Sequence, residues 1–316
     1  SREVPMTVAP PGGLPAKKRP EPSARSLNQW LRDAEKQTAS PQQWLGWQLA
    51  STIVIAALQR AMGPDAVPLF LVKGGVYVEM QLGGKAPIRA TKDIDTLFRG
   101  TVADFATTLR QVMAQPWGPF TLETSDIEQI AGAKRLVKPC RFDVRLNLKG
   151  AIWRRVRVEA SFPEAHIADH AYPVPVPPVG FYGVDAPDQV SGIVMDYQVA
   201  QKLHACTDPD TTEWTNDRVR DVIDINLLHD HFYPGDPPAS LKRAVTDLFE
   251  ARASEAAQLG EPTRHWPPVV TANNQWRILY PDLAASVGLE LPLDAAIAQL
   301  NTWITAIDAV VDDNER

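Results

Sequence analysis

Apolar residues recur along the chain in two spacings, one typical of buried strands and the other of helices. Short apolar or alternating runs predict strands at residues 67–72, 93–98, 140–148 and 153–161, with Lys149-Gly150 as a hairpin turn between the last two. Spacings of three and four residues predict helices from Ser26 onward, from Ser40 to Met62, and at 76–82 and 105–113. The first half of the chain is therefore expected to be a mixed α/β domain.

Helical spacing dominates the second half of the chain. Residues 173–187 are dense in Pro and Gly, which indicates a connection between domains. Beyond them the pattern predicts helices at 188–205, 217–232, 238–259 and 293–311. The expected fold class is α+β, with a mobile Pro-rich arm at residues 1–25, a mixed-sheet domain at 26–185 and an all-α domain at 186–316.

The composition excludes several classes of protein. Of the 316 residues, 44% are apolar and 22% are charged, which excludes a disordered or collagen-like chain. The longest near-apolar run, residues 49–58, is about half as long as a membrane span, and no charged-then-apolar leader opens the sequence. The two cysteines, Cys140 and Cys206, are too few for a disulfide framework. We therefore expect a soluble, cytoplasmic protein without a membrane partner.

A pair of aspartates follows a pair of glycines in the first half of the chain. Asp93 and Asp95 lie two residues apart on an expected strand, so alternation places both carboxylates on one face. Adjacent carboxylates repel each other unless a cation lies between them, and oxygen ligands at this separation suit Mg²⁺. Gly74 and Gly75, between a strand and a helix, let backbone N–H groups approach a phosphate. These features together predict a site for phosphoryl or nucleotidyl transfer.

Three motifs, taken in order, resemble those of a known family. The first is Gly-Gly followed by Arg-x-Thr-x-Asp-Ile-Asp at residues 74–95, the second is Ala-x-Lys-Leu-x-Ala at 200–205, and the third is Arg-x-Arg-Asp-x-x-Asp at 218–224. This set resembles the AbiEii/AbiGii toxins, which include the mycobacterial MenT toxins, in the DNA-polymerase-beta-like nucleotidyltransferase superfamily. The resemblance covers residues 73–224 and implies a polymerase-beta-like mixed-sheet domain followed by helices.

The resemblance also implies a set of metal ligands. Asp93 and Asp95 would hold Mg²⁺, which neutralises the charge that develops as pyrophosphate leaves. A third acid is expected on a neighbouring strand, and in these toxins it tends to lie on the later strand of the hairpin, which favours Glu159. Asp143 fits the polymerase-like pattern comparably well, so the choice between the two acids stays open.

The later motifs imply residues that handle the nucleotide. Lys202 would contact its phosphates as a point charge, and Asp224 would orient either Lys202 or the incoming hydroxyl group. Asp221 would pair only with a neighbouring arginine, and Thr91 would bond a phosphate. The expected catalytic residues are Asp93, Lys202 and Asp224, and the expected nucleotide-binding residues are Gly74, Gly75, Thr91 and Lys202.

The activity that the resemblance implies is that of a bacterial toxin. It would use Mg²⁺ to add nucleotides from an NTP to the 3′ end of tRNA, which blocks translation. Its partner would be a cognate antitoxin, either a transcription-regulator-like protein or a kinase that modifies Thr91. Two other classes stay open: a nucleotidyltransferase that modifies a small molecule or a protein, and a non-catalytic binding protein of the same fold.

The charge of the chain is unevenly distributed. The net charge of −6 argues against nucleic acid as a partner if it is taken as a whole. Residues 131–160, however, contain nine lysines and arginines and only two acids, a local balance of +7. A basic hairpin beside a magnesium site is where an RNA backbone is expected to lie. The expected RNA-binding residues are Arg141, Arg145, Arg155 and Arg157.

Overall fold

A single mixed sheet forms the framework of the first half of the chain. The computed structural model describes residues 17–85 and 91–311, so residues 1–16 of the expected arm, and Arg89 of the first motif, lie outside the described residues. Within the described residues the sheet has eight strands in the order β3-β5-β6-β2-β1-β8-β7, and β4 pairs with β5. The strands are β1 (Phe70–Lys73), β2 (Asp93–Phe98), β3 (Phe120–Thr124), β4 (Glu128–Gln129), β5 (Cys140–Leu148), β6 (Ala151–Ser161), β7 (Ala171–Pro175) and β8 (Gln189–Ile193).

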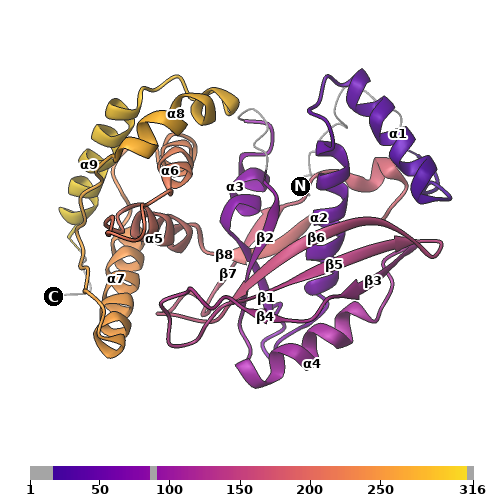
Figure 1. The fold of residues 1–316 in the computed structure, drawn as a ribbon, viewed down its shortest axis with the longest axis horizontal. Coiled ribbons are helices and arrows are strands. Elements are labelled where there is room, and N and C mark those ends of the chain that lie inside the picture. The colour runs from indigo at the N-terminus through magenta and orange to yellow at the C-terminus, as the bar shows by residue number, and fades with distance from the viewer. Residues whose placement is uncertain (1–16, 86–90, 312–316) are drawn as a thin grey trace, which may run out of the picture.

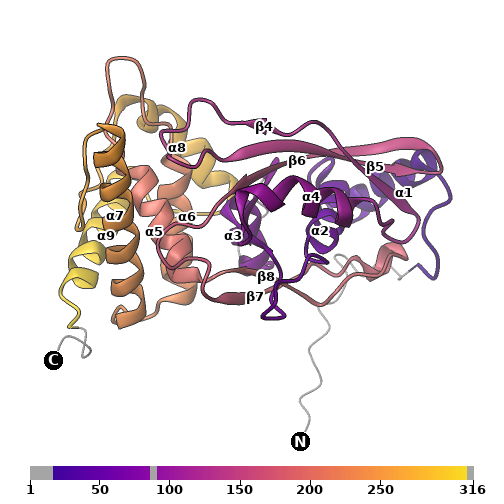
Figure 2. The same cartoon turned by 90° about the horizontal axis from the view of Figure 1, so that it is seen from below.

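Helices cover the apolar face of this sheet and also form a separate group beside it. The helices of the first half are α1 (Ala24–Gln37), α2 (Trp44–Leu58), α3 (Gly74–Leu82) and α4 (Val102–Met113), and those of the second half are α5 (Met195–Cys206), α6 (Val219–Phe232), α7 (Ala239–Leu259), α8 (Asn274–Ser286) and α9 (Leu293–Asp308). In Figures 1 and 2 the helices α5 to α9 lie together at one end of the molecule, the sheet lies at the other, and α3 lies at the junction. None of the described helices is long and apolar enough to cross a membrane.

Strand alternation separates the core from the opposite face of the sheet. Ile94, Val158 and Phe142 are aligned across β2, β6 and β5, and at most 2% of each is exposed. These residues belong to the main hydrophobic core, which also contains the buried residues of α2 and α4. Because successive side chains of a strand point to opposite faces, Asp93 and Asp95 project away from this core.

The segment at 173–187, expected to be a connection between domains, includes regular structure in part. It contains most of β7 and a 3-10 helix, Val179–Tyr182, and β7 pairs with β8. The helix expected from residue 188 begins only at Met195, because residues 189–193 form β8, which runs parallel to β1. The division into domains stays a prediction, but a boundary after residue 185 would separate two paired strands, so a boundary after Ile193 fits the sheet better.

The other expected elements agree with the structure in type. The strands expected at 93–98 and 140–148 have these bounds, and the hairpin turn at Lys149-Gly150 has positive φ angles of 50° and 77°. The sheet followed by helices confirms the expected α+β arrangement. The pattern of the chain did not predict β3, β4, β7, β8 or α8.

Candidate active site

Charged residues form two rows across the outer face of the sheet. In the first row Lys73 of β1 is paired with Asp95 of β2, Asp95 with Glu159 of β6, and Glu159 with Arg141 of β5. Residues directly opposite each other on adjacent strands share a face, so these four side chains emerge on one surface. The first row therefore places two acids side by side with a cation at each end.

The second row lies two residues along the strands. Asp93 of β2 is opposite Arg157 of β6, which is opposite Asp143 of β5. The two rows together bring Asp93, Asp95 and Glu159 to neighbouring positions on the two central strands. Strand alternation alone predicted the aspartate pair, and the register of β2 with β6 adds Glu159 to it.

Burial and the neighbouring carboxylates raise the pKa of two acids of this cluster, Glu159 and Asp93. Burial raises the pKa of Glu159, and the carboxylates of Asp95 and Asp93 raise it further. The pKa of Asp93 is also raised, mainly by burial and to a smaller extent by Asp95, while Arg157 opposes the shift. Burial lowers the pKa of Lys73, and the Asp95 carboxylate partly offsets this effect. Such a cluster favours a bound cation, which would relieve the repulsion between the carboxylates.

The two candidates for the third acid have different surroundings. Asp143 accepts from Arg157 Nε at 3.3 Å and lies 3.7 Å from Arg155 Nη1, so two guanidinium groups already balance its charge. Glu159 lies directly beside Asp95 in the register of the strands. These surroundings favour Glu159 as the third acid, and its role stays a prediction.

The donor set is suited to a magnesium ion that keeps other ligands. Within the described residues, no group of three or more His, Cys, Asp or Glu side chains converges closely enough to hold a metal ion. Mg²⁺ is commonly held by one or two carboxylates and takes its remaining ligands from water and from substrate phosphates. The pair of Asp93 and Asp95 fits this requirement, and Glu159 lies directly opposite Asp95 in the strand register.

Gly74 forms the surface against which the Asp95 carboxylate lies. Its φ angle is +67°, and a Cβ atom added there would lie only 2.0 Å from Asp95 Oδ2. Gly74 and Gly75 open helix α3, whose first N–H groups have no partners within the helix. The structure thus places these glycines at the carboxylates, on the helix end that favours anions. Among the described residues, the buried Thr91 Oγ1 has no hydrogen-bond partner.

The second and third motifs converge on one buried lysine. Lys202 of α5 donates to Asp221 Oδ1 at 2.6 Å and to Asp224 Oδ2 at 2.7 Å, both on α6. The expectation that Asp221 pairs only with an arginine is wrong, because Asp221 and Asp224 lie three residues apart on the helix and both reach the ammonium group. Two carboxylates therefore hold the charge of Lys202 in a fixed place.

Gln198, which no sequence pattern singled out, connects these two parts of the site. It lies on α5 one turn before Lys202, and its side chain is hydrogen-bonded to the backbone of Gly74. Lys73 was also not predicted as a site residue, although it precedes the glycines and is aligned with Asp95. The signal in the sequence was the four-residue spacing between Gln198 and Lys202, which is informative only once the helix is known.

A buried ionic network attaches the helical group to the sheet. Glu164, which follows β6, accepts two hydrogen bonds from Arg252 of α7, both at 2.8 Å. It also pairs with Arg135 at 3.0 Å and accepts from Gln201 at 2.8 Å. Burial alone would raise the pKa of Glu164, but the two arginines outweigh it and hold this pKa far below its ordinary value. The position of α5 relative to the sheet therefore depends on fully paired charges.

The basic residues expected to bind RNA lie on the same outer face. Arg141 pairs with Glu128 at 3.3 Å, and Arg155 and Arg157 flank Asp143 as described above. Arg145 is directly opposite Arg155 in the β5–β6 register. The register of β2, β6 and β5 therefore places these four arginines on the face that carries Asp93 and Asp95.

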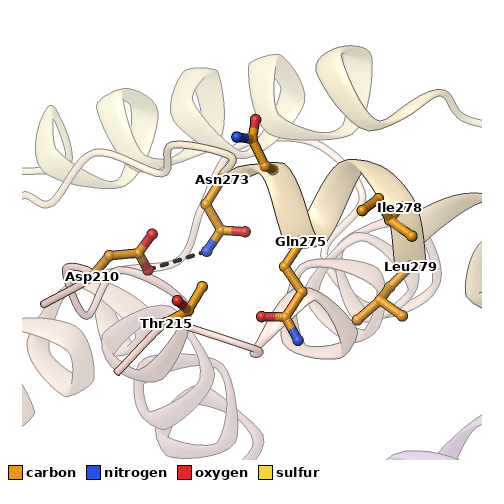
Figure 3. A pocket seen from close by; sticks show the side chains of 7 residues that line it. Asp210, Thr215, Asn273, Gln275, Ile278 and Leu279 are labelled. Carbon is orange, nitrogen blue, oxygen red and sulfur yellow. Dashed lines mark hydrogen bonds between the residues drawn. The ribbon is translucent and has the colours of Figure 1, made fainter. Parts of the chain in front are cut away.

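A surface pocket lies elsewhere, on the helical group. Its volume is about 570 Å³, and Figure 3 shows Asn273 directed toward Asp210, with an Nδ2 to Oδ1 distance of 3.1 Å. Ile278 and Leu279 of α8 form its apolar side. In the part of the chain that the structure describes, none of the expected site residues lines this pocket, and Asp210 is its single charged lining residue, without the second carboxylate or the lysine or arginine that phosphoryl transfer would use.

Known proteins resemble this chain over most of its length. A family model described as "Nucleotidyl transferase AbiEii toxin, Type IV TA system" matches residues 56–311. No curated protein matches the sequence. Among solved structures, the chain is similar to MenT4, a nucleotidyltransferase toxin from Mycobacterium tuberculosis H37Rv, with a TM-score of 0.49, 14% sequence identity and coverage of 85% of each chain.

Proposed function

Because the chain belongs to the AbiEii family of nucleotidyltransferase toxins of type IV toxin–antitoxin systems, we propose that it transfers nucleotides from an NTP to the 3′ end of tRNA. The observation that carries this proposal is the position of Asp93 and Asp95 beside Gly74, on the face that also presents the basic hairpin. The aspartate pair suits a cation, Gly74 at the start of a helix suits the triphosphate, and the basic hairpin suits a polyanionic acceptor.

The proposed reaction is an in-line displacement at the α-phosphate. The terminal hydroxyl of the acceptor loses its proton to water, and its oxygen bonds to the α-phosphorus. The bond from the α-phosphorus to the oxygen that bridges to the β-phosphate breaks, and pyrophosphate leaves. Mg²⁺ held by Asp93 and Asp95 would supply charge neutralisation at the phosphates.

Side chains of this protein position the triphosphate. Lys202 directs a fixed positive charge toward the phosphates, because Asp221 and Asp224 restrict its ammonium group. The N–H groups that follow Gly74 at the start of α3 and the hydroxyl of Thr91 donate to phosphate oxygens, while the Gly74 N–H is held by Gln198. Most of the catalytic effect then comes from positioning and preorganised charge.

Control by an antitoxin follows from the family, since a type IV system pairs a toxin with an antitoxin. The resemblance implies either a regulator-like protein or a kinase that acts on Thr91. Thr91 Oγ1 is buried, so a kinase would need this part of the site to open before it could reach the hydroxyl.

The proposal is tested by incubating the protein with each α-labelled NTP, Mg²⁺ and total tRNA. Asp93→Asn removes one metal-binding charge, and Asp33→Asn makes the same change on the exposed surface of α1 as a control. We expect label in tRNA with the wild type and the control, and its loss with Asp93→Asn. Label found only in protein or in a small molecule would overturn the tRNA acceptor, and no transfer from any NTP would overturn the activity itself.

A further inference from the structure

The side-chain amide of Gln198 is paired with both polar groups of Gly74. The Gly74 N–H donates to Gln198 Oε1 at 3.0 Å, and Gln198 Nε2 donates to the Gly74 carbonyl oxygen at 3.3 Å. Gln198 is only 1% exposed, so little water is available to replace either bond. Losing a partner inside a protein leaves a buried polar group unsatisfied, which is costly. The amide therefore fixes the orientation of the Gly74 backbone.

The orientation of Gly74 matters because Asp95 lies against it. A side chain at Gly74 would overlap the Asp95 carboxylate, with Cβ 2.6 Å from Cγ and 2.0 Å from Oδ2. Glycine adopts the positive φ angle of Gly74 at little cost. A glycine whose backbone is not held by hydrogen bonds, however, also samples other conformations. Rotation of this backbone would change the space available to the carboxylate and the direction of the first N–H groups of α3.

Gln198 also ties helix α5 to the start of α3, beside the Asp95 carboxylate. Gln198 and Lys202 are four residues apart, so they lie on the same face of α5, one helical turn from each other. Lys202 is tied to α6 through Asp221 and Asp224. The amide of Gln198 is thus a direct link between the lysine side of the site and the carboxylate side, in addition to the Glu164 network.

We propose that Gln198 is a positioning residue, which holds the Gly74 backbone and the Asp95 carboxylate in register with Lys202. The inference rests on the proposed nucleotidyl transfer for its effect on rate. The structural part of the inference is that Gln198 restrains Gly74 and the cation site, and this part does not depend on which acceptor receives the nucleotide.

The test is Gln198→Met, which keeps the length of the side chain and removes both hydrogen bonds. Gln59→Met is a matched control, because Gln59 pairs with backbone in the same way at the other end of β1. Its Nε2 donates to the carbonyl oxygens of Phe70 and Ser191, at 3.0 and 2.6 Å, and its Oε1 accepts from Ser191 N–H at 2.8 Å. The two variants thus separate a general loss of hydrogen bonding from a loss at the site.

Three measurements are made on the full chain. Amide exchange of Gly74 is expected to become faster in Gln198→Met and to stay unchanged in Gln59→Met. The affinity for Mn²⁺, followed by electron paramagnetic resonance, is expected to fall only in Gln198→Met. For nucleotide transfer we expect kcat to fall about 10- to 100-fold, with a higher Mg²⁺ requirement, since small misplacements at a reacting centre have effects of this size.

The outcomes distinguish this inference from the proposed function. If Gly74 exchange and Mn²⁺ affinity in Gln198→Met equal those of Gln59→Met, Gln198 has no positioning role, whatever the activity. If the wild type transfers no nucleotide, the proposed function fails, and exchange and Mn²⁺ affinity still decide the role of Gln198. A variant that loses activity with unchanged exchange and Mn²⁺ affinity would also overturn the inference.

Discussion

At Gly74 the absence of a single carbon atom makes room for the Asp95 carboxylate. Gly74→Ala is expected to reduce transfer more than tenfold and to destabilise the fold by about 1–3 kcal/mol, because it combines a positive φ with a steric overlap. Gly260→Ala is the control, since its φ is +72° and nothing lies within 4 Å of an added Cβ. Transfer assays and chemical denaturation of both variants check the expectation. Equal activity in the two variants would show that the space beside Asp95 is not required.

The identity of the third acid is a second question at the scale of single residues. Glu159→Gln is expected to reduce transfer strongly and to weaken Mn²⁺ binding, because it removes a carboxylate next to Asp95. Asp143→Asn should leave Mn²⁺ affinity nearly unchanged, since Asp143 is paired with Arg155 and Arg157. Titration of both variants with Mn²⁺, beside the transfer assay, decides the matter. The reverse order of effects would assign the third position to Asp143.

Some site residues were predictable from the sequence, and others required the fold. The Asp93 and Asp95 pair follows from strand alternation alone, and Lys202 and Asp224 follow from the motifs. Gln198 was not predictable, because its role depends on the contact of α5 with the start of α3, which lies more than 100 residues earlier in the chain. Long-range docking of this kind leaves no periodic signal in the sequence.

Between elements, the strongest polar connection is the network around Glu164. Glu164→Gln is expected to lower the free energy of unfolding by about 3–5 kcal/mol at pH 7, because the buried Arg252 loses its counter-charge. Asp294→Asn, which breaks an exposed pair with Arg277, is the control and should cost about 0–1 kcal/mol. Denaturant unfolding measures both values. A loss at Glu164 no greater than at Asp294 would mean that the network does not stabilise the docking of the helices.

The same network gives a pH dependence of stability. The pKa of Glu164 in the folded protein lies below its ordinary value of 4.5, so the folded state favours the ionised carboxylate. Its contribution is therefore fully present well above pH 4.5 and is lost as the pH falls below that value. The difference in unfolding free energy between the wild type and Glu164→Gln should stay constant from about pH 8 to 6 and shrink below about pH 4.5. A difference that grows on acidification would contradict this sign.

Sequence patterns failed at elements whose residues break the usual rules. β7 contains Pro173 and Pro175, and prolines at this density are typical of a loop. β7 is an edge strand, however, and an edge strand tolerates proline because its outer N–H groups need no partner. β8 contains Gly192, where Tyr77 and Val174 side chains lie 2.7 Å from the position that Cβ would take. Pro281 lies within α8 and obscures that helix in the sequence. In each case the packing of the neighbouring element decides the structure.

For the molecule as a whole, the structure distinguishes two groups of basic residues within the stretch at residues 131–160. Lys134 and Arg135 pair with Glu261 and Glu255, at 2.9 and 2.7 Å, so they stabilise the contact with α7 and its C-terminal end. Arg141, Arg145, Arg155 and Arg157 instead occupy the outer face of the hairpin. Two of the charges of this stretch are therefore already used within the protein, and the arginines on the outer face of the hairpin are the ones that we propose for the polyanion.

This division predicts which arginines control the salt dependence of tRNA binding. Arg145→Gln combined with Arg155→Gln removes two charges that lie opposite each other on the hairpin. We expect tRNA affinity to fall about tenfold and the slope of log K against log [salt] to become shallower by about 1 for each phosphate that is no longer neutralised. Arg32→Gln combined with Lys36→Gln removes two exposed charges from α1 and serves as the control of equal net charge. Fluorescence anisotropy with labelled tRNA over a series of salt concentrations measures both slopes. If the two double variants lose affinity and slope equally, binding follows net charge alone and the hairpin is not the RNA surface.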